Sequence, residues 1–263
     1  MTAVPLQWIE EGDGPLVVLL HGFPEFSYAW RHQMPALARA GFRVVAPDLR
    51  GYGHSPKPKG VDAYRLTEIV DDLRALIDKL GDAPFVLVGH DWGAFAAWFF
   101  AMTYPELVRK LVILNVPHPA PLSREVRRST RQKLKLLYQL FFRLPLVPEL
   151  LTRVAGKFAM RWLGRFTRDE IATYARSWRG NRMFDYYRAV PRARHQLRRM
   201  IRPMAIPTLL IWSEHEPVFL RETTENFHEW VPNLRVAIVK DAGHFVQEDA
   251  PEEVTRLILE FAS

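Results

Sequence analysis

The sequence predicts an α/β protein, a mostly parallel sheet flanked by helices, with an all-helical insertion. Short apolar runs of buried-strand length alternate with helical patterns in both terminal parts of the chain. After Pro119 the alternation stops for about 85 residues, and apolar positions recur only at helical spacing. The same stretch, residues 119–203, holds 21 Lys and Arg against 5 Asp and Glu. We therefore expect a core of residues 1–118 and 204–263, with a helical cap of residues 119–203 inserted in it.

The first part of the chain reads as strand and helix in turn. Strands are expected where the sequence is continuously apolar, at residues 15–20, 42–46, 85–88 and 108–116. Helices are expected where apolar residues fall on one helical face, at residues 30–40, 66–80 and 94–104. Gly41 and Gly81 follow the first two of these helices and suit their C-terminal ends.

The same alternation returns after the helical stretch. Within that stretch, Pro145 and Pro148 divide the pattern into shorter helices. Beyond it, strands are expected at residues 208–212 and 235–239, and helices at residues 221–230 and 252–261. Because parallel strands joined by helices form one sheet, both terminal parts are expected to share it.

Composition excludes several classes of protein. The chain is 48% hydrophobic and has no cysteine, which rules out disulfides and thiolate chemistry. We see no signal peptide and no apolar run long enough to span a membrane, so a soluble cytoplasmic protein is expected. The net charge is +7, but no nucleic-acid-binding motif accompanies it. The basic stretch is interpreted as solvated helical faces; the alternative is attraction to an anionic membrane surface or an acidic substrate.

The strongest chemical signal is Gly89-His90-Asp91-Trp92-Gly93, at a predicted strand-to-helix junction. Glycines on both sides of a central residue allow the tight turn called a nucleophile elbow. Here the central residue is Asp91, and the start of the following helix favours its negative charge. Asp91 is thus predicted to be a carboxylate nucleophile, although an aspartate at this place could instead only cap the helix.

A carboxylate nucleophile forms an ester that water must then hydrolyse, which requires a base and an oxyanion hole. Backbone N–H groups of Phe23, in His21-Gly22-Phe23-Pro24, and of Trp92 are the expected oxyanion donors. His21 is expected to be structural, and Pro24 to follow a cis bond.

The base and its acid partner are expected near the end of the chain. His244 follows the last predicted strand and is the expected base. Glu216, after the strand at 208–212, is the expected acid that orients it, with Glu214 as the alternative.

The segments HGFPEFSYAWRHQ, DLRGYGHS, GHDWGA and DAGHF together resemble the epoxide hydrolases of the α/β-hydrolase superfamily. The resemblance implies the α/β-hydrolase fold and two cap tyrosines above the nucleophile, carried here by Tyr138 and Tyr187. Tyr174 and Tyr186 are expected to be packing residues. Ser213 and Glu216 stand where the family usually has Gly and Asp, so the chain departs from the family pattern at the acid. The stretch before His21 is also short for the family, as though the chain were trimmed there or the sheet had one edge strand fewer.

The resemblance implies hydrolysis of an epoxide to a vicinal diol through an ester on Asp91, without a metal or organic cofactor. We expect a small epoxide and water as partners, no nucleic acid and no transmembrane segment, and we allow for a homo-oligomer. A haloalkane dehalogenase with the same triad is the first alternative. It needs side-chain N–H donors for the halide, commonly Trp92 together with an Asn or a second Trp. Phe23 offers no such donor, and Trp162 and Trp178 could compensate. A non-catalytic binding protein on the same fold is the second alternative.

Overall fold

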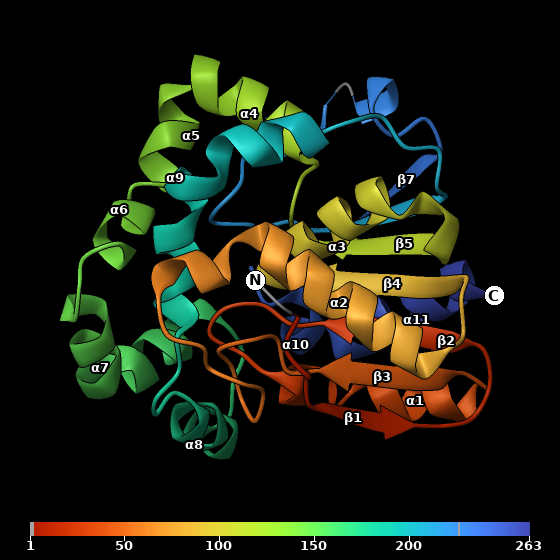
Figure 1. Cartoon of the computed structure of the whole chain (residues 1–263), viewed down its shortest axis with the longest axis horizontal. Helices are drawn as coiled ribbons and strands as arrows, with labels where there is room; N and C mark the ends of the chain where they lie inside the picture. Colours follow the sequence, from red (N-terminus) through yellow and green to blue (C-terminus); the bar gives the residue numbers. More distant parts are fainter. Residues whose placement is uncertain (1–2, 226) are drawn as a thin grey trace.

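The computed structural model describes residues 3–225 and 227–263 and shows a twisted sheet between layers of helices (Figure 1). Within these residues the sheet has seven strands, in the order β1-β3-β2-β4-β5-β6-β7. Every neighbouring pair is parallel except β1 with β3. The strands are β1 Trp8–Glu11, β2 Leu16–Leu20, β3 Arg43–Pro47, β4 Phe85–His90, β5 Val108–Leu114, β6 Thr208–Ser213 and β7 Leu234–Val239.

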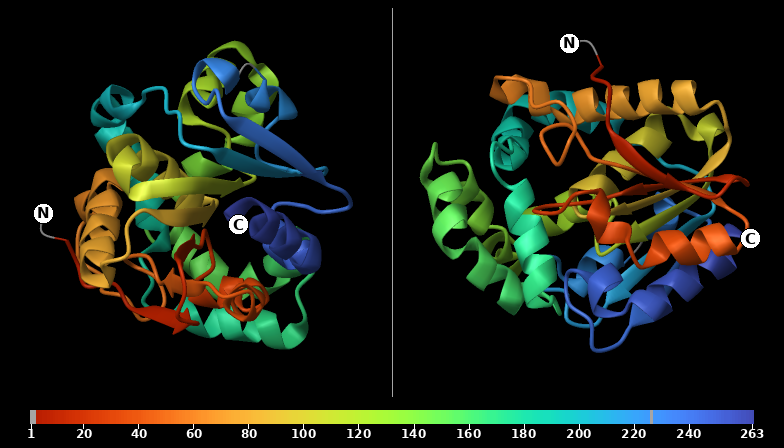
Figure 2. Two further views of the ribbon diagram at one scale, coloured as in Figure 1. Left: turned by 90° about the vertical axis from the view of Figure 1, so that its right-hand side faces the viewer. Right: turned by 90° about the horizontal axis from the view of Figure 1, so that it is seen from below.

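Two hydrophobic cores lie on opposite faces of the sheet. Side chains alternate along each strand, so Val17 and Leu19 of β2 join one core while Val18 and Leu20 join the other. Helices α1 (Gln33–Arg39) and α11 (Pro251–Ala262) cover the first core, and α2 (Leu66–Leu80) and α3 (Trp92–Thr103) cover the second. The right-hand view of Figure 2 shows the sheet between these two helical layers. Burial on both faces explains why the strands read as continuous apolar runs.

Between β5 and β6 the chain forms helices alone. They gather at the edge of the sheet where the parallel strands end (Figure 1). They are α4 Pro119–Arg128, α5 Thr130–Lys135, α6 Tyr138–Phe142, α7 Val147–Leu163, α8 Arg168–Ser177 and α9 Met183–Met200. In the described parts of the chain, no helix has the length and apolar character needed to cross a membrane.

The prediction of a helix at residues 221–230 is wrong. The described residues there form two short 3₁₀ turns, Arg221–Thr224 and Phe227–Glu229. The hydroxyls of Thr223 and Thr224 donate to the carbonyls of Leu220 and Arg221. Since side-chain hydroxyls occupy carbonyls that a helix would use, the local sequence does not continue as a helix.

Two further differences lie near the start of the chain. No strand is expected before residue 15, yet β1 forms an antiparallel edge strand whose side chains are mostly exposed. An exposed edge strand lacks an apolar run, which hides it from pattern analysis. The helix expected at residues 30–40 begins only at Gln33, after a 3₁₀ turn over Ser27–Trp30.

The turn from β4 into α3 depends on glycines because the backbone packs against its neighbours there. A Cβ on Gly89 would lie 2.6 Å from the carbonyl oxygen of Gly93, and a Cβ on Gly93 would lie 2.3 Å from that of Leu20. Contacts this short with backbone atoms cannot be relieved by moving a side chain. The two glycines therefore allow the start of α3 to sit directly on the end of β2.

We expect Gly93→Ala to lower the free energy of unfolding by about 3 kcal/mol, because its Cβ would overlap the Leu20 carbonyl. Gly60→Ala is the matched control, since Gly60 has a φ of +90° but no neighbour within 4 Å of an added Cβ. Backbone strain alone should cost the control about 1 kcal/mol. Urea unfolding measures both losses, and equal losses would mean that the Leu20 contact does not shape the turn.

Candidate active site

Asp91 lies between β4 and α3 in a backbone conformation that few residues adopt, with φ 47° and ψ −116°. Its side chain makes no capping hydrogen bond to α3, so it does not act as a simple helix cap. Instead it points into a cavity, and only 8% of the residue is exposed. A non-glycine residue held in such a conformation is typical of functional sites.

The loop after β2 approaches Asp91 from the neighbouring strand. The backbone N–H of Phe23 donates to Asp91 Oδ1 at 2.7 Å. A Cβ on Gly22 would lie 2.3 Å from Asp91 Cβ, so glycine is required for this approach. Trp92 is the first residue of α3, where backbone N–H groups have no acceptor within the helix. The Phe23–Pro24 peptide bond is cis.

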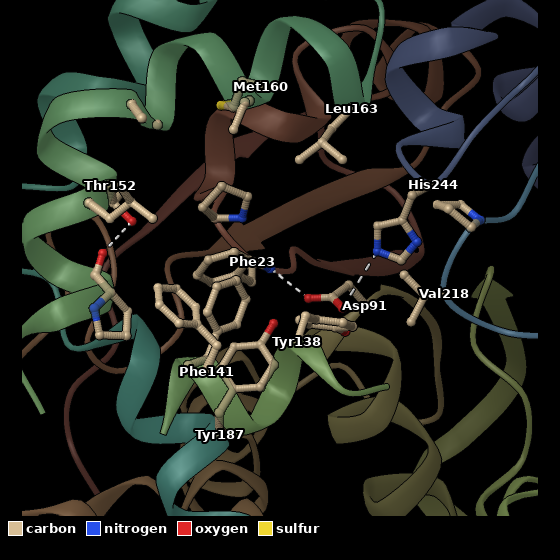
Figure 3. Close-up of a pocket in the computed structure, with 18 of the residues that line it drawn as sticks. Phe23, Asp91, Tyr138, Phe141, Thr152, Met160, Leu163, Tyr187, Val218 and His244 are labelled. Atoms are coloured by element: carbon tan, nitrogen blue, oxygen red, sulfur yellow. Dashed lines mark hydrogen bonds and ion pairs between the residues drawn. The ribbon is translucent and has the colours of Figure 1, made fainter. Parts of the chain in front are cut away.

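His244 lies on the other side of the carboxylate (Figure 3). Its Nε2 is 3.6 Å from Asp91 Oδ2, and its Nδ1 is 2.9 Å from Glu216 Oε2. The other Glu216 oxygen accepts the backbone N–H of Val218 at 2.7 Å, which fixes the carboxylate. Glu214 is exposed and accepts the N–H of Asp241 instead. The structure thus brings Glu216, and not Glu214, to His244.

Asp91 and His244 shift each other's pKa. Burial alone would raise the pKa of Asp91, but the ion pair with His244 and the Phe23 N–H hold that pKa below its ordinary value. Burial alone would lower the pKa of His244, but the carboxylates of Glu216 and Asp91 raise it well above its ordinary value. At neutral pH the site therefore holds an ionised Asp91 beside a protonated His244.

The helices above the sheet add two phenols. Tyr138 comes from α6 and Tyr187 from α9, with ring centroids 6.3 Å apart, and both lie beside the Asp91 carboxylate (Figure 3). Burial and then the charge of Asp91 raise the pKa of Tyr138. Burial, Tyr138 and Asp91, in that order, raise the pKa of Tyr187 well above its ordinary value. Both phenols are therefore protonated and able to donate hydrogen bonds.

The other two tyrosines have different surroundings. Tyr186 is buried and its hydroxyl donates to the Arg50 carbonyl at 2.7 Å. Tyr174 is buried and donates to Glu248 at 2.6 Å. Neither hydroxyl is available at Asp91, which agrees with their expected packing role.

Two cavities meet at the nucleophile. One has a volume of about 440 Å³ and an almost entirely apolar lining that includes α7 and Phe245. The other, of about 450 Å³, lies towards α4 and α9 and is more polar. Three residues line both, namely Asp91, Tyr138 and Tyr187. A molecule bound in either cavity can thus present an atom to the carboxylate and to both phenols.

The sequence patterns do not indicate two positioning residues, His90 and Asn115. His90 Nδ1 lies 3.1 Å from a carboxylate oxygen of Glu25, and its Nε2 lies 2.8 Å from the His244 carbonyl oxygen. Asn115, after β5, donates to the carbonyls of Gly243 and His244 and accepts the N–H of Ser213. These bonds fix the loop that carries His244. His90 stands inside the recognised motif, whereas Asn115 has no sequence signal beyond its place at a strand end.

Two groups of His, Asp and Glu among the described residues have the spacing of metal ligands, but neither contacts Asp91. In the first, His32, Glu170 and Glu248, the guanidinium of Arg31 already lies 2.5 Å from Glu170 and 2.6 Å from Glu248. The second consists of exposed residues around Glu214. The site at Asp91 is built from a carboxylate, an imidazole and phenols.

Comparison with known proteins places this arrangement in a family. The profile of the α/β hydrolase fold family matches residues 15–251. The AB hydrolase superfamily protein YfhM of Bacillus subtilis is 35% identical over 95% of this chain and 90% of its own length. Epoxide hydrolase 4 of Mus musculus is 34% identical over 94% of this chain and 72% of its own length.

Solved structures agree with these relatives. A mutant of an epoxide hydrolase from Bacillus megaterium, complexed with its diol product, is 35% identical and superposes with a TM-score of 0.89, covering 99% of this chain and 98% of that one. Epoxide hydrolase A from Mycobacterium thermoresistibile is 29% identical with a TM-score of 0.86, covering 97% and 94%. The chain therefore belongs to the α/β-hydrolase family and, within it, to the group that includes the epoxide hydrolases.

Proposed function

We propose that this protein hydrolyses an epoxide to a vicinal diol through a covalent ester on Asp91. The observation that carries the proposal is the pair of protonated phenols, Tyr138 and Tyr187, beside a buried and ionised carboxylate. When an epoxide opens, its oxygen stays attached to the product as an alkoxide and needs a proton. Phenols held at the attacking carboxylate supply that proton.

The first half-reaction is attack by Asp91 on an epoxide carbon. Oδ1 already accepts the Phe23 N–H, which leaves Oδ2 as the attacking oxygen. The new bond joins Oδ2 to carbon while the epoxide C–O bond breaks. Tyr138 and Tyr187 donate hydrogen bonds to the departing oxygen, and one phenol gives up its proton. The product is a hydroxyalkyl ester of Asp91.

The second half-reaction is hydrolysis of that ester. His244 takes a proton from water, and the water oxygen attacks Asp91 Cγ. The negative charge develops on Oδ1, where the N–H groups of Phe23 and Trp92 stabilise it. The Cγ–Oδ2 bond then breaks, and Oδ2 leaves with the diol, taking a proton from the new carboxylic acid and so restoring the Asp91 carboxylate. The proton that His244 removed from water stays on the imidazole, which is protonated again as in the free protein.

Ester formation also prepares His244 for its role. In the free protein, the charges of Glu216 and Asp91 both raise the His244 pKa. Esterification removes the Asp91 charge, and burial then lowers the pKa of His244 with only Glu216 opposing it. The imidazole thus passes its proton to the phenolate that ring opening leaves behind, and it becomes able to accept one from water.

Residues 119–203 act in this proposal as a cap over the core, since they supply both phenols from α6 and α9. A core of residues 1–118 and 204–263 supplies the triad and the oxyanion donors. The apolar lining of the 440 Å³ cavity suits a hydrophobic epoxide.

The dehalogenase alternative needs a second side-chain N–H donor beside the indole N–H of Trp92, which lines a cavity with Asp91. The indole N–H of Trp178 donates to the Pro24 carbonyl at 2.9 Å and is not free to bind a halide. Trp162 is 76% exposed on the outer side of α7. Phe23 contributes only its backbone N–H, which already bonds to Asp91.

Incubation with matched panels of terminal epoxides and haloalkanes tests the reaction class. We expect diol release and no halide release. Tyr138→Phe and Tyr187→Phe should each slow ester formation about 10²–10³-fold, since one donor to a developing charge is worth roughly 2–4 kcal/mol. The double variant should form almost no ester in pre-steady-state measurements. Ester formation at the parent rate in the double variant would favour a dehalogenase.

His244→Gln should block only the second half-reaction. Intact-protein mass spectrometry should then show one substrate mass added to the protein, because Asp91 is still ionised and able to attack. The double variant Asp91→Ala/His244→Gln is the control and should show no adduct. An adduct that persists in the double variant would assign the nucleophile to another residue.

Ester hydrolysis should fall as the pH is lowered, because His244 acts as a base only when neutral. Ester formation should persist to lower pH, since the pKa of Asp91 is held below its ordinary value. The ester should therefore accumulate in acid, as acid-quenched mass spectrometry would show. Glu216→Ala should slow hydrolysis at every pH, whereas the neighbouring control Glu214→Ala should not. The reverse order would reassign the acid to Glu214.

A further inference from the structure

Helix α7 exposes a row of large apolar side chains. Leu146 precedes the helix, and Leu150, Val154, Phe158 and Trp162 follow at steps of four residues, each between 64% and 79% exposed. Residues four apart lie on successive turns of the same side of a helix. We call these five residues the α7 stripe. A contiguous exposed apolar surface of this kind is typical of a binding surface rather than of random exposure.

Basic side chains follow the stripe. Arg153, Lys157 and Arg161 are exposed and also recur at steps of four residues, one position before Val154, Phe158 and Trp162. The acidic residue of α7, Glu149, pairs with Arg188 at 2.7 Å. The outer face of α7 therefore combines apolar side chains with uncompensated positive charge. This combination is characteristic of helices that lie in the plane of a membrane surface.

The opposite face of the same helix lines the apolar cavity. Thr152, Met160 and Leu163 point into it (Figure 3). Leu151 and Leu163 line the cavity and are also 50% and 49% exposed. The apolar surface is thus continuous from the α7 stripe, around the helix, to the cavity that ends at Asp91.

We propose that α7 docks on a bilayer surface containing anionic phospholipid. The α7 stripe enters the boundary between headgroups and acyl chains, and Arg153, Lys157 and Arg161 meet the lipid phosphates. The cavity then opens next to the lipid, so an apolar epoxide dissolved in the bilayer reaches Asp91 without crossing water. Delivery of a substrate rests on the proposed function, whereas the docking itself does not.

A lipid surface fits the charge better than a second copy of the chain. In a two-fold contact the same patch faces itself, which would bring Arg153, Lys157 and Arg161 against their own copies. Residues 119–203 as a whole carry 21 basic and 5 acidic side chains, so repulsion would extend beyond the helix. An anionic bilayer instead attracts the basic side chains and the net positive charge of these residues. Trp162, whose ring centroid lies 6.0 Å from that of Phe158, is a residue type that settles at the headgroup level.

The position of α7 leaves it accessible. It lies on the outside of the helical layer, far from the sheet, in both Figure 1 and the right-hand view of Figure 2. No part of the described chain covers the α7 stripe, as the exposed fractions of its side chains show. The helix can therefore lie flat on a surface while the core remains in water.

Flotation with vesicles tests the docking without any epoxide. The full chain should bind vesicles of equal amounts of phosphatidylglycerol and phosphatidylcholine, bind pure phosphatidylcholine poorly, and dissociate in high salt. The triple variant Leu150→Ser/Val154→Ser/Phe158→Ser should lose about 100-fold in partitioning. Arg153→Gln/Lys157→Gln/Arg161→Gln should lose about as much, since each neutralised charge is worth roughly fivefold.

Two matched controls make the same changes elsewhere on the surface. They replace exposed residues outside α7, in Ile9→Ser/Val236→Ser/Ile238→Ser and in Lys59→Gln/Arg235→Gln/Lys240→Gln. Both should bind vesicles like the parent. All four variants should turn over a water-soluble epoxide at the parent rate, because none of the changed residues lines the cavity at Asp91.

Three outcomes would overturn the inference. The parent chain could fail to bind the mixed vesicles, or the α7 variants could bind them as well as the controls do. Light scattering could also show a dimer that only the apolar α7 variant dissolves, which would assign the stripe to a second copy. Vesicle binding that depends on α7, in a protein that hydrolyses no epoxide, would support the docking and contradict the proposed function.

Discussion

The constraint on which the rest of the structure depends is a carboxylate that stays charged while almost fully buried. Taking such a charge out of water costs several kcal/mol unless partners surround it. Asp91 is 8% exposed, yet its pKa lies below the ordinary value, because His244 and the Phe23 N–H compensate for burial. Those partners come from the loops after β7 and β2, whereas Asp91 follows β4. A parallel sheet is the arrangement that brings three such loops to one edge, so fold and chemistry impose the same geometry.

His90 and Asp91 are neighbours where β4 ends, and their side chains point to opposite sides. Asp91 faces the cavity, while the preceding residue, His90, faces the interior and contacts the His244 carbonyl oxygen at 2.8 Å. Asn115 contacts the same carbonyl from β5. The nucleophile and the base are therefore held relative to each other through the backbone of the His244 loop, and not only through the 3.6 Å contact between their side chains. Backbone support of this kind leaves the imidazole free to change protonation without losing its place.

The parts predicted from sequence are those whose signal is local. Buried parallel strands appear as apolar runs, and the order of Asp91, Glu216 and His244 follows from strand ends. The edge strand β1 and the turns at Arg221–Thr224 and Phe227–Glu229 are not predicted, because exposed strands and hydroxyl-capped turns carry no periodic pattern. The choice of Glu216 over Glu214 is decided by which side chain turns inward, a property of the loop after β6. The tyrosines were assigned through family resemblance, since nothing in the helical pattern itself distinguishes Tyr187 from its neighbour Tyr186.

The basic side chains of residues 119–203 are not the groups that keep the Asp91 carboxylate ionised. The groups that most lower the Asp91 pKa, namely His244, His90 and the Phe23 N–H, all belong to the sheet and its loops. Of residues 119–203, the two that line both cavities together with Asp91, namely Tyr138 and Tyr187, carry neutral phenols. The arginines of residues 119–203 are not among the groups that keep Asp91 ionised, so their charge is available for the docking proposed for α7. A helix such as α7, apolar towards the cavity and both apolar and basic towards the outside, connects those two functions within one element.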